Sequence, residues 1–352
     1  MKTIGVLTSG GDAPGMNAAV RAVVRTAIDA GLKVKGIRHG YHGLINGEIF
    51  DMDIRSVSDI IHKGGTILYS ARCPEFKTEE GMAKAVKTCK ELGIDGIVAI
   101  GGDGTFRGAT DLSIRGIPTI GIPGTIDNDI TSTDYSIGFD TAMNTTMRMI
   151  DNLRDTCESH ARCDVIEAMG RNAGWIALES GIATGAVAIA IGEVPFDADA
   201  AIERIKKLRA QGQRSFIVVV SETFGAEFSE GFAKRIQDET GVETKFARFA
   251  HIVRGGSPTL RDRLTATKMG KYAVDLLLDG KSDLVVCEKN AKIVPTEIKF
   301  ALIVDRMFKN KLKDGDLDNF TEEQVELMKK ICAEKQASFD DMMNTAILLA
   351  QN

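Results

Sequence analysis

The chain has 352 residues, of which 43% are hydrophobic and 26% are charged, with 36 glycines and 7 prolines. These fractions are typical of a globular protein and exclude the disordered, collagen-like and disulfide-scaffold classes. The length predicts two domains, because a single core of this size would be unusually large. The net charge of −5 provides no global basic field for nucleic acid or an anionic membrane.

Neither the N-terminus nor the cysteines indicate export. No apolar run is long enough to cross a bilayer, and the first residues, MKTIGVLTSGG, read as a strand and a loop rather than a signal peptide. We therefore expect a cytoplasmic protein with no membrane partner. The cysteines have no metal-ligand spacing and are expected to be free thiols: Cys73, Cys89, Cys157, Cys163, Cys287 and Cys332.

Strand, loop and helix alternate along the chain. Apolar runs predict strands at residues 4–7, 97–100, 119–122, 164–168, 186–191, 215–221 and 284–287. Helical spacing of apolar residues predicts helices at 17–30, 81–92, 141–155, 198–210, 264–278 and, in the charged tail, 322–349. This order predicts an α/β fold whose parallel strands are joined by right-handed crossovers.

Polar loops follow three of the predicted strands, at residues 10–12, 101–104 and 125–129, and the first two are rich in glycine. In a parallel sheet, ligands bind outside the carboxyl ends of the strands. We therefore expect the three loops to lie at one edge of one sheet and to form a binding site there.

The loop Gly101-Gly102-Asp103-Gly104-Thr105 suits a polyphosphate. Glycines let backbone N–H groups approach phosphate oxygens, and the following helix offers its positive N-terminus. Asp103 can hold Mg²⁺ directly or through water. The loop is neither a P-loop nor a well-placed GxGxxG motif. Taken alone, it is equally compatible with a tight strand-to-helix turn.

The segment 123–130 places two carboxylates, Asp127 and Asp129, beside the hydroxyl of Thr125. One carboxylate can accept a proton from an attacking hydroxyl while the other helps to hold a metal ion. An Asx-rich turn is the alternative, since Asp-Asn-Asp suits such a turn well. The neighbouring loops favour the chemical interpretation.

Four arginines lie beside glycines or strand ends, where a guanidinium can bind phosphate bidentately. They are Arg72, Arg162, Arg171 and Arg254. Each one alone is compatible with a solvated surface arginine. Together with three phosphate-suited loops, they favour a phosphorylated substrate in addition to a nucleotide.

The chain resembles the bacterial-type ATP-dependent 6-phosphofructokinases over roughly its first 290 residues. The matching segments are residues 4–19, the loops around Gly102 and Asp127, Met169-Gly170-Arg171, Glu222, residues 251–258 and residues 273–277. The resemblance implies two α/β/α domains of similar topology, with mostly parallel sheets and an active site in the cleft between them. It implies a nucleotide-binding domain of residues 1–138 plus about 252–305, and a sugar-phosphate-binding domain of residues 139–251 plus about 306–352.

The family transfers the γ-phosphoryl group of ATP to the 1-hydroxyl of fructose 6-phosphate, giving fructose 1,6-bisphosphate and ADP in the committed step of glycolysis. By this resemblance, Asp127 is the general base, Thr125 and Arg171 contact the transferring phosphoryl group, and Arg72 stabilises the transition state. Asp103 and Asp129 are the carboxylates associated with Mg²⁺. Residues matching the ATP contacts are Gly11, Tyr41, Arg72, Cys73, Gly102, Asp103, Gly104 and Thr105.

Residues matching the sugar-phosphate contacts are Thr125, Ile126, Asp127, Arg162, Met169, Gly170, Arg171, Glu222, Lys245, His251, Ile252, Val253 and Arg254. In the family, the residues matching Arg162 and Lys245 reach the active site of a neighbouring subunit. The resemblance therefore implies a homo-oligomer, with a tetramer favoured and a dimer possible. Lys245 stands where many members have arginine, so a point charge replaces a bidentate fork.

The phosphoryl donor remains open between ATP and pyrophosphate. A pyrophosphate-using branch typically carries Asp and Lys at the positions of Gly104 and Gly124, and two glycines favour ATP. The family's effector site binds ADP or phosphoenolpyruvate between subunits and is matched by Arg21, Arg25, Asp59 and Arg154. Val187, Gln211 and Gln213 replace the Glu and Lys of regulated members, so we expect weak or altered regulation.

Two other functions compete with this interpretation. NAD and diacylglycerol kinases share the Gly-Gly-Asp-Gly-Thr loop, but their resemblance ends there. A non-catalytic subunit that binds sugar phosphate does not require a base, and retention of Asp103, Asp127 and Arg171 argues against it. We expect the lone Trp175 to be a core or interface residue.

Overall fold

The computed structural model describes residues 1–350 and has the predicted α/β architecture, with two mostly parallel sheets. The chain forms two compact units. The first unit contains Met1–Ile126, Ile130–Thr141 and Arg254–Cys332, and the second contains Asp127–Asp129, Ala142–Val253 and residues 333–350. Residues 306–332 thus lie in the first unit, whereas the sequence-based division assigned them to the second domain.

The first unit contains a seven-stranded sheet in the order β11-β10-β5-β4-β1-β2-β3. Its five inner strands are parallel, while β3 and β11 pair antiparallel at the two edges. The strands are β1 (Thr3–Thr8), β2 (Lys33–Ile37), β3 (Ile49–Met52), β4 (Gly96–Gly101), β5 (Thr119–Pro123), β10 (Leu284–Lys289) and β11 (Lys292–Glu297).

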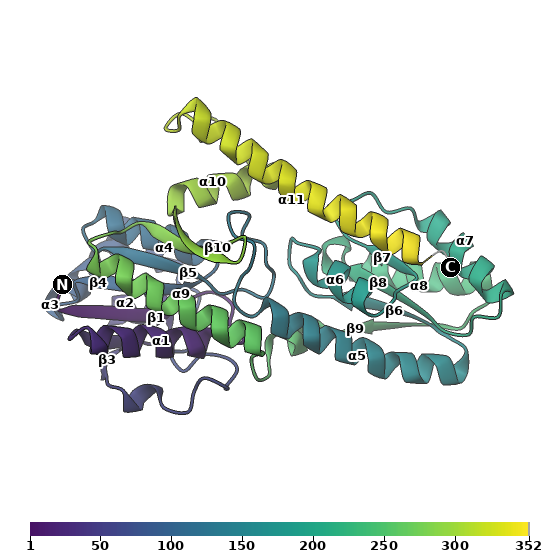
Figure 1. Cartoon of the computed structure of the whole chain (residues 1–352), viewed down its shortest axis with the longest axis horizontal. Coiled ribbons are helices and arrows are strands. Elements are labelled where there is room, and N and C mark those ends of the chain that lie inside the picture. The colour runs from purple at the N-terminus through teal and green to yellow at the C-terminus, as the bar shows by residue number, and fades with distance from the viewer. Residues whose placement is uncertain (351–352) are drawn as a thin grey trace. The chain divides into compact units, whose positions relative to one another are not determined.

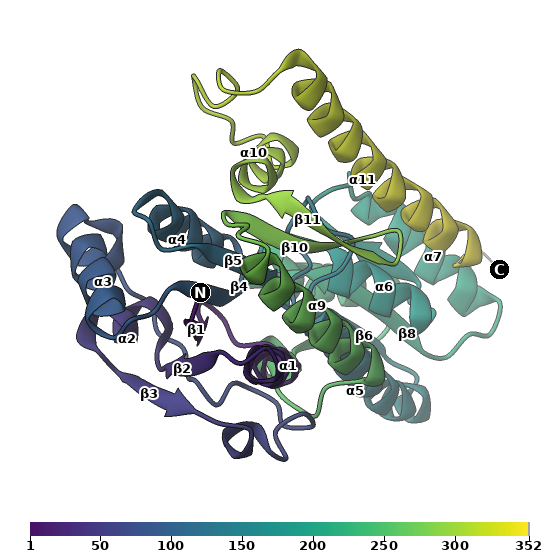
Figure 2. The same cartoon turned by 60° about the vertical axis from the view of Figure 1, so that its left-hand side comes forward.

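Helices cover both faces of this sheet (Figure 2). They are α1 (Met16–Asp29), α2 (Gly40–Asn46), α3 (Glu79–Glu91), α4 (Asp103–Ile114), α9 (Leu260–Leu278) and α10 (Ile298–Phe308). On one face, Leu7 and Ile97 pack against apolar residues of α2 and α3. On the other, α1 and α9 come so close that a Cβ on Gly270 would lie 2.7 Å from that of Ala22.

The second unit contains a four-stranded parallel sheet in the order β7-β8-β6-β9 (Figure 1). The strands are β6 (Cys163–Ala168), β7 (Ala188–Ala190), β8 (Phe216–Ser221) and β9 (Thr244–Arg248). Its helices are most of α5 (Phe139–His160), together with α6 (Trp175–Ala183), α7 (Ala198–Ala210) and α8 (Ala226–Thr240). Val165, Val218 and Val220 form the core with α7 and α8.

The tail forms α11 (Glu322–Leu349), with the bounds that the sequence predicts. In the first unit, Met328 is fully buried against Phe300 and Val304. In the second, the ring of Phe339 stacks on Trp175 with 3.7 Å between ring centroids. Trp175 is therefore a core residue, as expected.

Within residues 1–350, no helix is both long enough and apolar enough to span a membrane. All six cysteines are free. Burial raises the pKa of the Cys89 thiol to about 12 and that of Cys157 to about 11.

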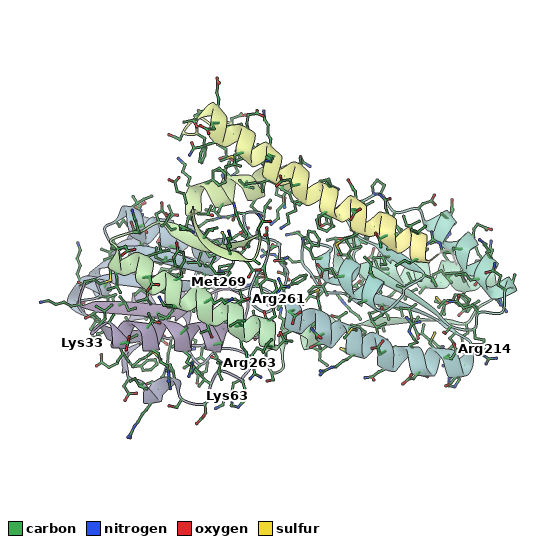
Figure 3. All side chains as sticks on the ribbon, viewed as in Figure 1. Lys33, Lys63, Arg214, Arg261, Arg263 and Met269 are labelled. Atoms are coloured by element: carbon green, nitrogen blue, oxygen red, sulfur yellow. The ribbon has the colours of Figure 1, made fainter. Side chains whose placement is uncertain are left out.

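A buried carboxylate, Asp262, joins two segments of the first unit that are distant in the sequence. It lies in the first turn of α9 and accepts hydrogen bonds from the Tyr135 hydroxyl (2.5 Å) and the Gly138 N–H (2.6 Å). The Thr141 N–H and hydroxyl also donate to it, at 2.9 and 2.5 Å. Arg261, beside it on α9 (Figure 3), lies over the Tyr135 ring, 4.2 Å from its centroid. Desolvation is the largest influence on the Asp262 carboxyl and raises its pKa.

We predict that Asp262→Ala destabilises the protein by about 3 kcal/mol or more, because several buried donors lose their acceptor together. The free energy of unfolding in urea is the measurement. Asp275→Ala, which removes an ion pair with Lys271 on the surface of the same helix, should cost less than about 1 kcal/mol. Equal losses in the two variants would contradict the role assigned to Asp262.

Candidate functional site

The three predicted loops begin at adjacent strands of the first unit. Strand β4 pairs in parallel with β1 on one side and β5 on the other. Their carboxyl ends are therefore neighbours at one edge of the sheet, as predicted. Backbone hydrogen bonds continue beyond the strands, since Ser9 N–H donates to Ile100 (3.0 Å) and Gly124 N–H donates to Gly101 (3.0 Å).

The glycine-rich loop after β4 leads directly into α4, whose first residue is Asp103. Gly101 is packed against Ser9 and Thr105, and no side chain would fit there. Gly102 and Gly104 instead have open space where a Cβ would lie. The helix cap, Gly102, supplies no side-chain hydrogen bond. An anion can thus approach the N-terminal N–H groups of α4 without steric hindrance from side chains at positions 102 and 104.

Gly11 and Arg254 are brought together in the first unit. The guanidinium of Arg254 lies so close to Gly11 that a Cβ at position 11 would overlap it. Arg254 ends the short turn Ala250–Arg254 and is half-buried. A residue matched to the sugar phosphate therefore contacts a residue matched to the nucleotide.

Tyr41 lies beneath the glycine-rich loop and is 5% exposed. Its hydroxyl donates to the Thr105 carbonyl at 2.5 Å, and its ring stacks on Phe76 with 4.2 Å between centroids. Burial is the main reason that the pKa of its phenol is raised. In this position Tyr41 supports the start of α4 from below.

Arg72 and Cys73 follow a segment attached to the end of β1. Thr8 donates from its hydroxyl to the Tyr69 carbonyl (2.8 Å), and Ser70 donates to the Gly10 carbonyl (2.5 Å). Arg72 is exposed, whereas Cys73 packs partly against the apolar cluster of α2 and α3. Arg72 therefore follows by two residues the serine that bonds to the first phosphate-suited loop.

Lys309 is a charged neighbour of the site that the sequence did not reveal. Its Nζ lies 3.9 Å from Asp103 Oδ2 and 2.9 Å from Asp305 Oδ2. Only 15% of the Lys309 side chain is exposed. It follows α10, some two hundred residues after Asp103 in the sequence, and no local motif marks it. An ammonium group beside Asp103 lowers the net negative charge at the start of α4.

The segment carrying the predicted base is buried. Asp127, Asn128 and Asp129 are 4%, 4% and 9% exposed. Asn128 has a left-handed backbone with φ 48°, a conformation that asparagine tolerates. The segment can therefore be an Asx-type turn and also carry the two carboxylates that the chemical interpretation needs, since both Asp127 and Asp129 are buried within it.

In the second unit, Glu222 holds the loop that contains Met169, Gly170 and Arg171. Its Oε1 accepts the N–H groups of Gly170 (3.1 Å) and Arg171 (2.5 Å). Arg171 adopts a left-handed backbone with φ 57°, and it is exposed. The carboxylate thus positions the loop through its backbone and leaves the Arg171 guanidinium available to an anion.

Arg162 and Lys245 form a second group of cations in this unit. Arg162 Nε lies 3.0 Å from Glu243 Oε2, and Lys245 Nζ lies 2.8 Å from Glu243 Oε1. Hydrogen bonds from Lys245 and then Arg162 lower the pKa of Glu243 to about 2. Asp164, 5% exposed, follows on β6, and burial raises the pKa of its carboxyl. Glu243 was not predicted, since an exposed glutamate between two cations has no distinctive sequence signal.

Within the second unit, the pair Arg162 and Lys245 lies apart from Arg171 along β6. Arg162 precedes β6 and Lys245 pairs with its second residue, whereas Met169 and Arg171 follow its carboxyl end. A strand of six residues is about 20 Å long. Arg162 and Arg171 therefore belong to opposite ends of β6.

The remaining predicted residues differ in exposure. His251 and Ile252 are exposed, while Val253 is fully buried and anchors their turn. Ile126 is buried near the end of β5. Thr125 precedes it, and its carbonyl accepts the Ser136 hydroxyl at 2.6 Å.

The residues matched to the effector site lie in both units. Arg21 and Arg25 are one helical turn apart on α1, and burial followed by the charge of Arg25 lowers the pKa of Arg21. Asp59 is exposed on a backbone with φ 53°. In the second unit, Arg154 on α5 donates to the Thr184 carbonyl.

The carboxylates fit a magnesium ion better than a transition metal. Across residues 1–350, no group of three or more His, Cys, Asp and Glu side chains is arranged to hold a metal. Mg²⁺ is normally bound through one or two carboxylates together with substrate phosphates and water. Asp103 in the first unit and Asp129 in the second unit are donors of that kind.

Comparison with known proteins agrees with this geometry. The model of the phosphofructokinase family matches residues 3–277. An ATP-dependent 6-phosphofructokinase of Clostridium botulinum (strain Hall) is 55% identical over 314 residues, which cover 89% of this chain and 98% of that protein. The protein of the same name from Clostridium novyi (strain NT) is 52% identical over the same shares.

A solved phosphofructokinase from Saccharomyces cerevisiae superposes on the chain with a TM-score of 0.82 and 32% identity. The match covers 94% of this chain and 50% of that one. The family model spans most of the chain, and the bacterial relatives are matched almost from end to end. The chain belongs to the phosphofructokinase family.

Proposed function

We propose that this protein is an ATP-dependent 6-phosphofructokinase. It transfers the γ-phosphoryl group of ATP to the 1-hydroxyl of fructose 6-phosphate and releases fructose 1,6-bisphosphate and ADP. Two curated relatives at 55% and 52% identity carry this name. The observation that carries the proposal is the open, glycine-lined start of α4, beside the loops of β1 and β5.

The first unit binds the triphosphate. Gly11, Gly102 and Gly104 let the backbone approach the phosphates, and the N-terminus of α4 attracts their charge. Arg72 adds an exposed guanidinium from the adjoining segment. Tyr41 keeps this start of α4 in place through its hydrogen bond to Thr105.

Magnesium, when bound, screens the charge of the phosphates, and Asp103 and Asp129 are the residues that would hold it. Lys309 lies 3.9 Å from Asp103. It restrains that carboxylate and reduces the repulsion between it and the incoming nucleotide.

Asp127 removes the proton from the 1-hydroxyl as the oxygen attacks the γ-phosphorus, and the bond from that phosphorus to the β-phosphate bridging oxygen breaks. The carboxylate is 4% exposed, so little water competes for its oxygens. Phosphoryl transfer requires positioning and charge neutralisation more than covalent chemistry. Arg171 supplies positive charge for the transferring group, on the loop that Glu222 holds.

The sugar phosphate is bound by Arg254, His251 and the loop of Met169 and Gly170. Arg162 and Lys245 serve the active site of a neighbouring subunit in a homo-oligomer. Their position at the opposite end of β6 from Arg171 supports this assignment, because about 20 Å separates the ends of a six-residue strand. One subunit alone therefore lacks part of the phosphate clamp.

Regulation by ADP or phosphoenolpyruvate is expected to be weak. Val187 is an apolar residue, 4% exposed, where regulated members have an acidic one. Gln213 uses its side chain to donate to the Ser215 carbonyl at 2.8 Å, and it carries no positive charge for a phosphate.

Replacing the base should separate turnover from binding. We predict that Asp127→Ser lowers kcat by roughly a thousandfold or more while the KM for fructose 6-phosphate changes little, because the base acts only in the transition state. Steady-state assays with ATP and Mg²⁺ measure both constants. Asp279→Asn, an exposed carboxylate after α9, is the control and should match the wild type. A kcat within tenfold of the wild type in Asp127→Ser would contradict the proposed role.

The donor preference can be tested at Gly104, where a Cβ meets nothing within 4 Å. We predict that Gly104→Asp lowers kcat/KM for ATP by about tenfold or more, since a carboxylate would repel the phosphates at this open position. The melting temperature should remain close to that of the wild type. Gly231→Asp on α8, also in open space, is the matched control. Faster turnover of the wild type with pyrophosphate than with ATP would instead support the pyrophosphate-dependent alternative.

Subunit complementation tests the division of cations along β6. Asp127→Ser and Arg162→Ala should each be nearly inactive at low fructose 6-phosphate, for loss of the base and of a phosphate clamp respectively. Hybrids formed by co-expressing the two variants should recover activity, because some sites then combine an intact base with an intact arginine. Mixing the two purified variants without subunit exchange provides the baseline. Hybrids no more active than that baseline would refute the shared site.

A further inference from the structure

A cavity of about 320 Å³ lies in the second unit among β7, α7 and the last turns of α11. Figure 1 shows α11 ending beside α7. Most of its wall is apolar, including Val187 and Ile189 from the β7 segment, Phe196 before α7, and Met343, Ala346 and Ile347 from α11. A volume of this size is at the lower end of the range for small-molecule pockets.

The cavity is separate from the site described above. None of the residues assigned to ATP, metal or sugar phosphate lines it. Of the positions compared with the family's effector site, only Val187 does so, and there it contributes an apolar wall. The α11 wall lies beyond residues 3–277, which the family model matches.

One cation, Arg204 on α7, also lines the cavity. Its Nη1 donates to the Val187 carbonyl at 2.7 Å. No carboxylate of residues 1–350 forms an ion pair with it, in contrast to Arg162 or Arg235, which pair at 3.0 and 2.6 Å. Partial burial lowers the pKa of its guanidinium. A half-buried cation with no counter-charge is unfavourable, and an anion in the cavity would relieve that cost.

The second charged residue of the wall is Asp197, and its negative charge disfavours a second anionic group on the ligand. Its carboxylate caps α7 by accepting the Ala200 N–H at 2.9 Å. Asp197 precedes Arg204 by seven residues, which corresponds to about 10 Å along a helix. A ligand would place one negative group at Arg204 and would be repelled by Asp197 if it carried a second at its other end.

We propose that this cavity binds an apolar monocarboxylate of medium length, such as an unbranched fatty acid of about ten carbons. The carboxylate pairs with Arg204, and the hydrocarbon chain packs between the β7 segment and α11. The modest volume disfavours longer chains and coenzyme A esters. The proposal does not depend on the proposed kinase function.

The chain contains its own reporter of binding. Trp175 is the only tryptophan, and it stacks on Phe339, one helical turn before the wall residue Met343. Titration of the full chain with decanoate, followed by Trp175 fluorescence and by calorimetry, should therefore show saturable binding. Decanol, which has the same chain and no charge, should bind at least about tenfold more weakly.

Two variants locate the site. Arg204→Gln should weaken decanoate binding by about tenfold or more, whereas Lys207→Gln, an exposed cation on the same helix, should leave it unchanged. Ala346→Phe fills the cavity and should abolish binding of both probes. Circular dichroism checks that each variant is folded, and Arg204→Lys, which retains the charge, should recover part of the affinity if Arg204→Gln is unstable.

Three results would overturn the proposal. They are equal affinity for decanoate and decanol, wild-type affinity in folded Arg204→Gln, and no saturable binding below the concentration at which decanoate self-associates. Kinase assays on the same preparations keep the two hypotheses apart. Arg204→Gln should retain the wild-type rate with fructose 6-phosphate in the absence of decanoate, whatever the outcome of the binding experiment.

Discussion

The whole arrangement depends on the parallel pairing of β4 between β1 and β5. This pairing places three loops that are distant in the sequence at the same edge of the sheet. The hydrogen bonds from Ser9 to Ile100 and from Gly124 to Gly101 extend the pairing into the loops themselves. In the proposed function, the open start of α4 receives the triphosphate with these flanking loops held beside it.

Three carboxylates each restrain several neighbouring groups. Glu222 fixes a loop through two backbone N–H groups, and Glu243 aligns Arg162 with Lys245. Asp262 joins the start of α9 to the segment before α5. In each case one side chain restrains several partners, so that the cations and loops nearby are positioned before any ligand arrives.

The sequence predicted most of the buried strands and several of the long helices, but it missed the inner strand β2, the strand β9 and the helix α8. Residues 97–100 and 119–122 lie within β4 and β5, and the helix at 198–210 has the predicted bounds. The short edge strands β3 and β11 were missed, because their half-exposed residues show no continuous apolar run. The phosphate-suited loops carry local motifs and could be recognised. Lys309 and Arg204 could not, since their importance comes from neighbours that only the folded chain supplies.

The contact between Gly11 and Arg254 restricts how this protein can change over evolutionary time. A methyl group at position 11 would occupy the place of the guanidinium, so even alanine there would force the arginine to move. The residue assigned to the nucleotide and the one assigned to the sugar phosphate are thus mutually dependent. A substitution at position 11 that changes nucleotide binding therefore also moves Arg254 and changes the binding of sugar phosphate.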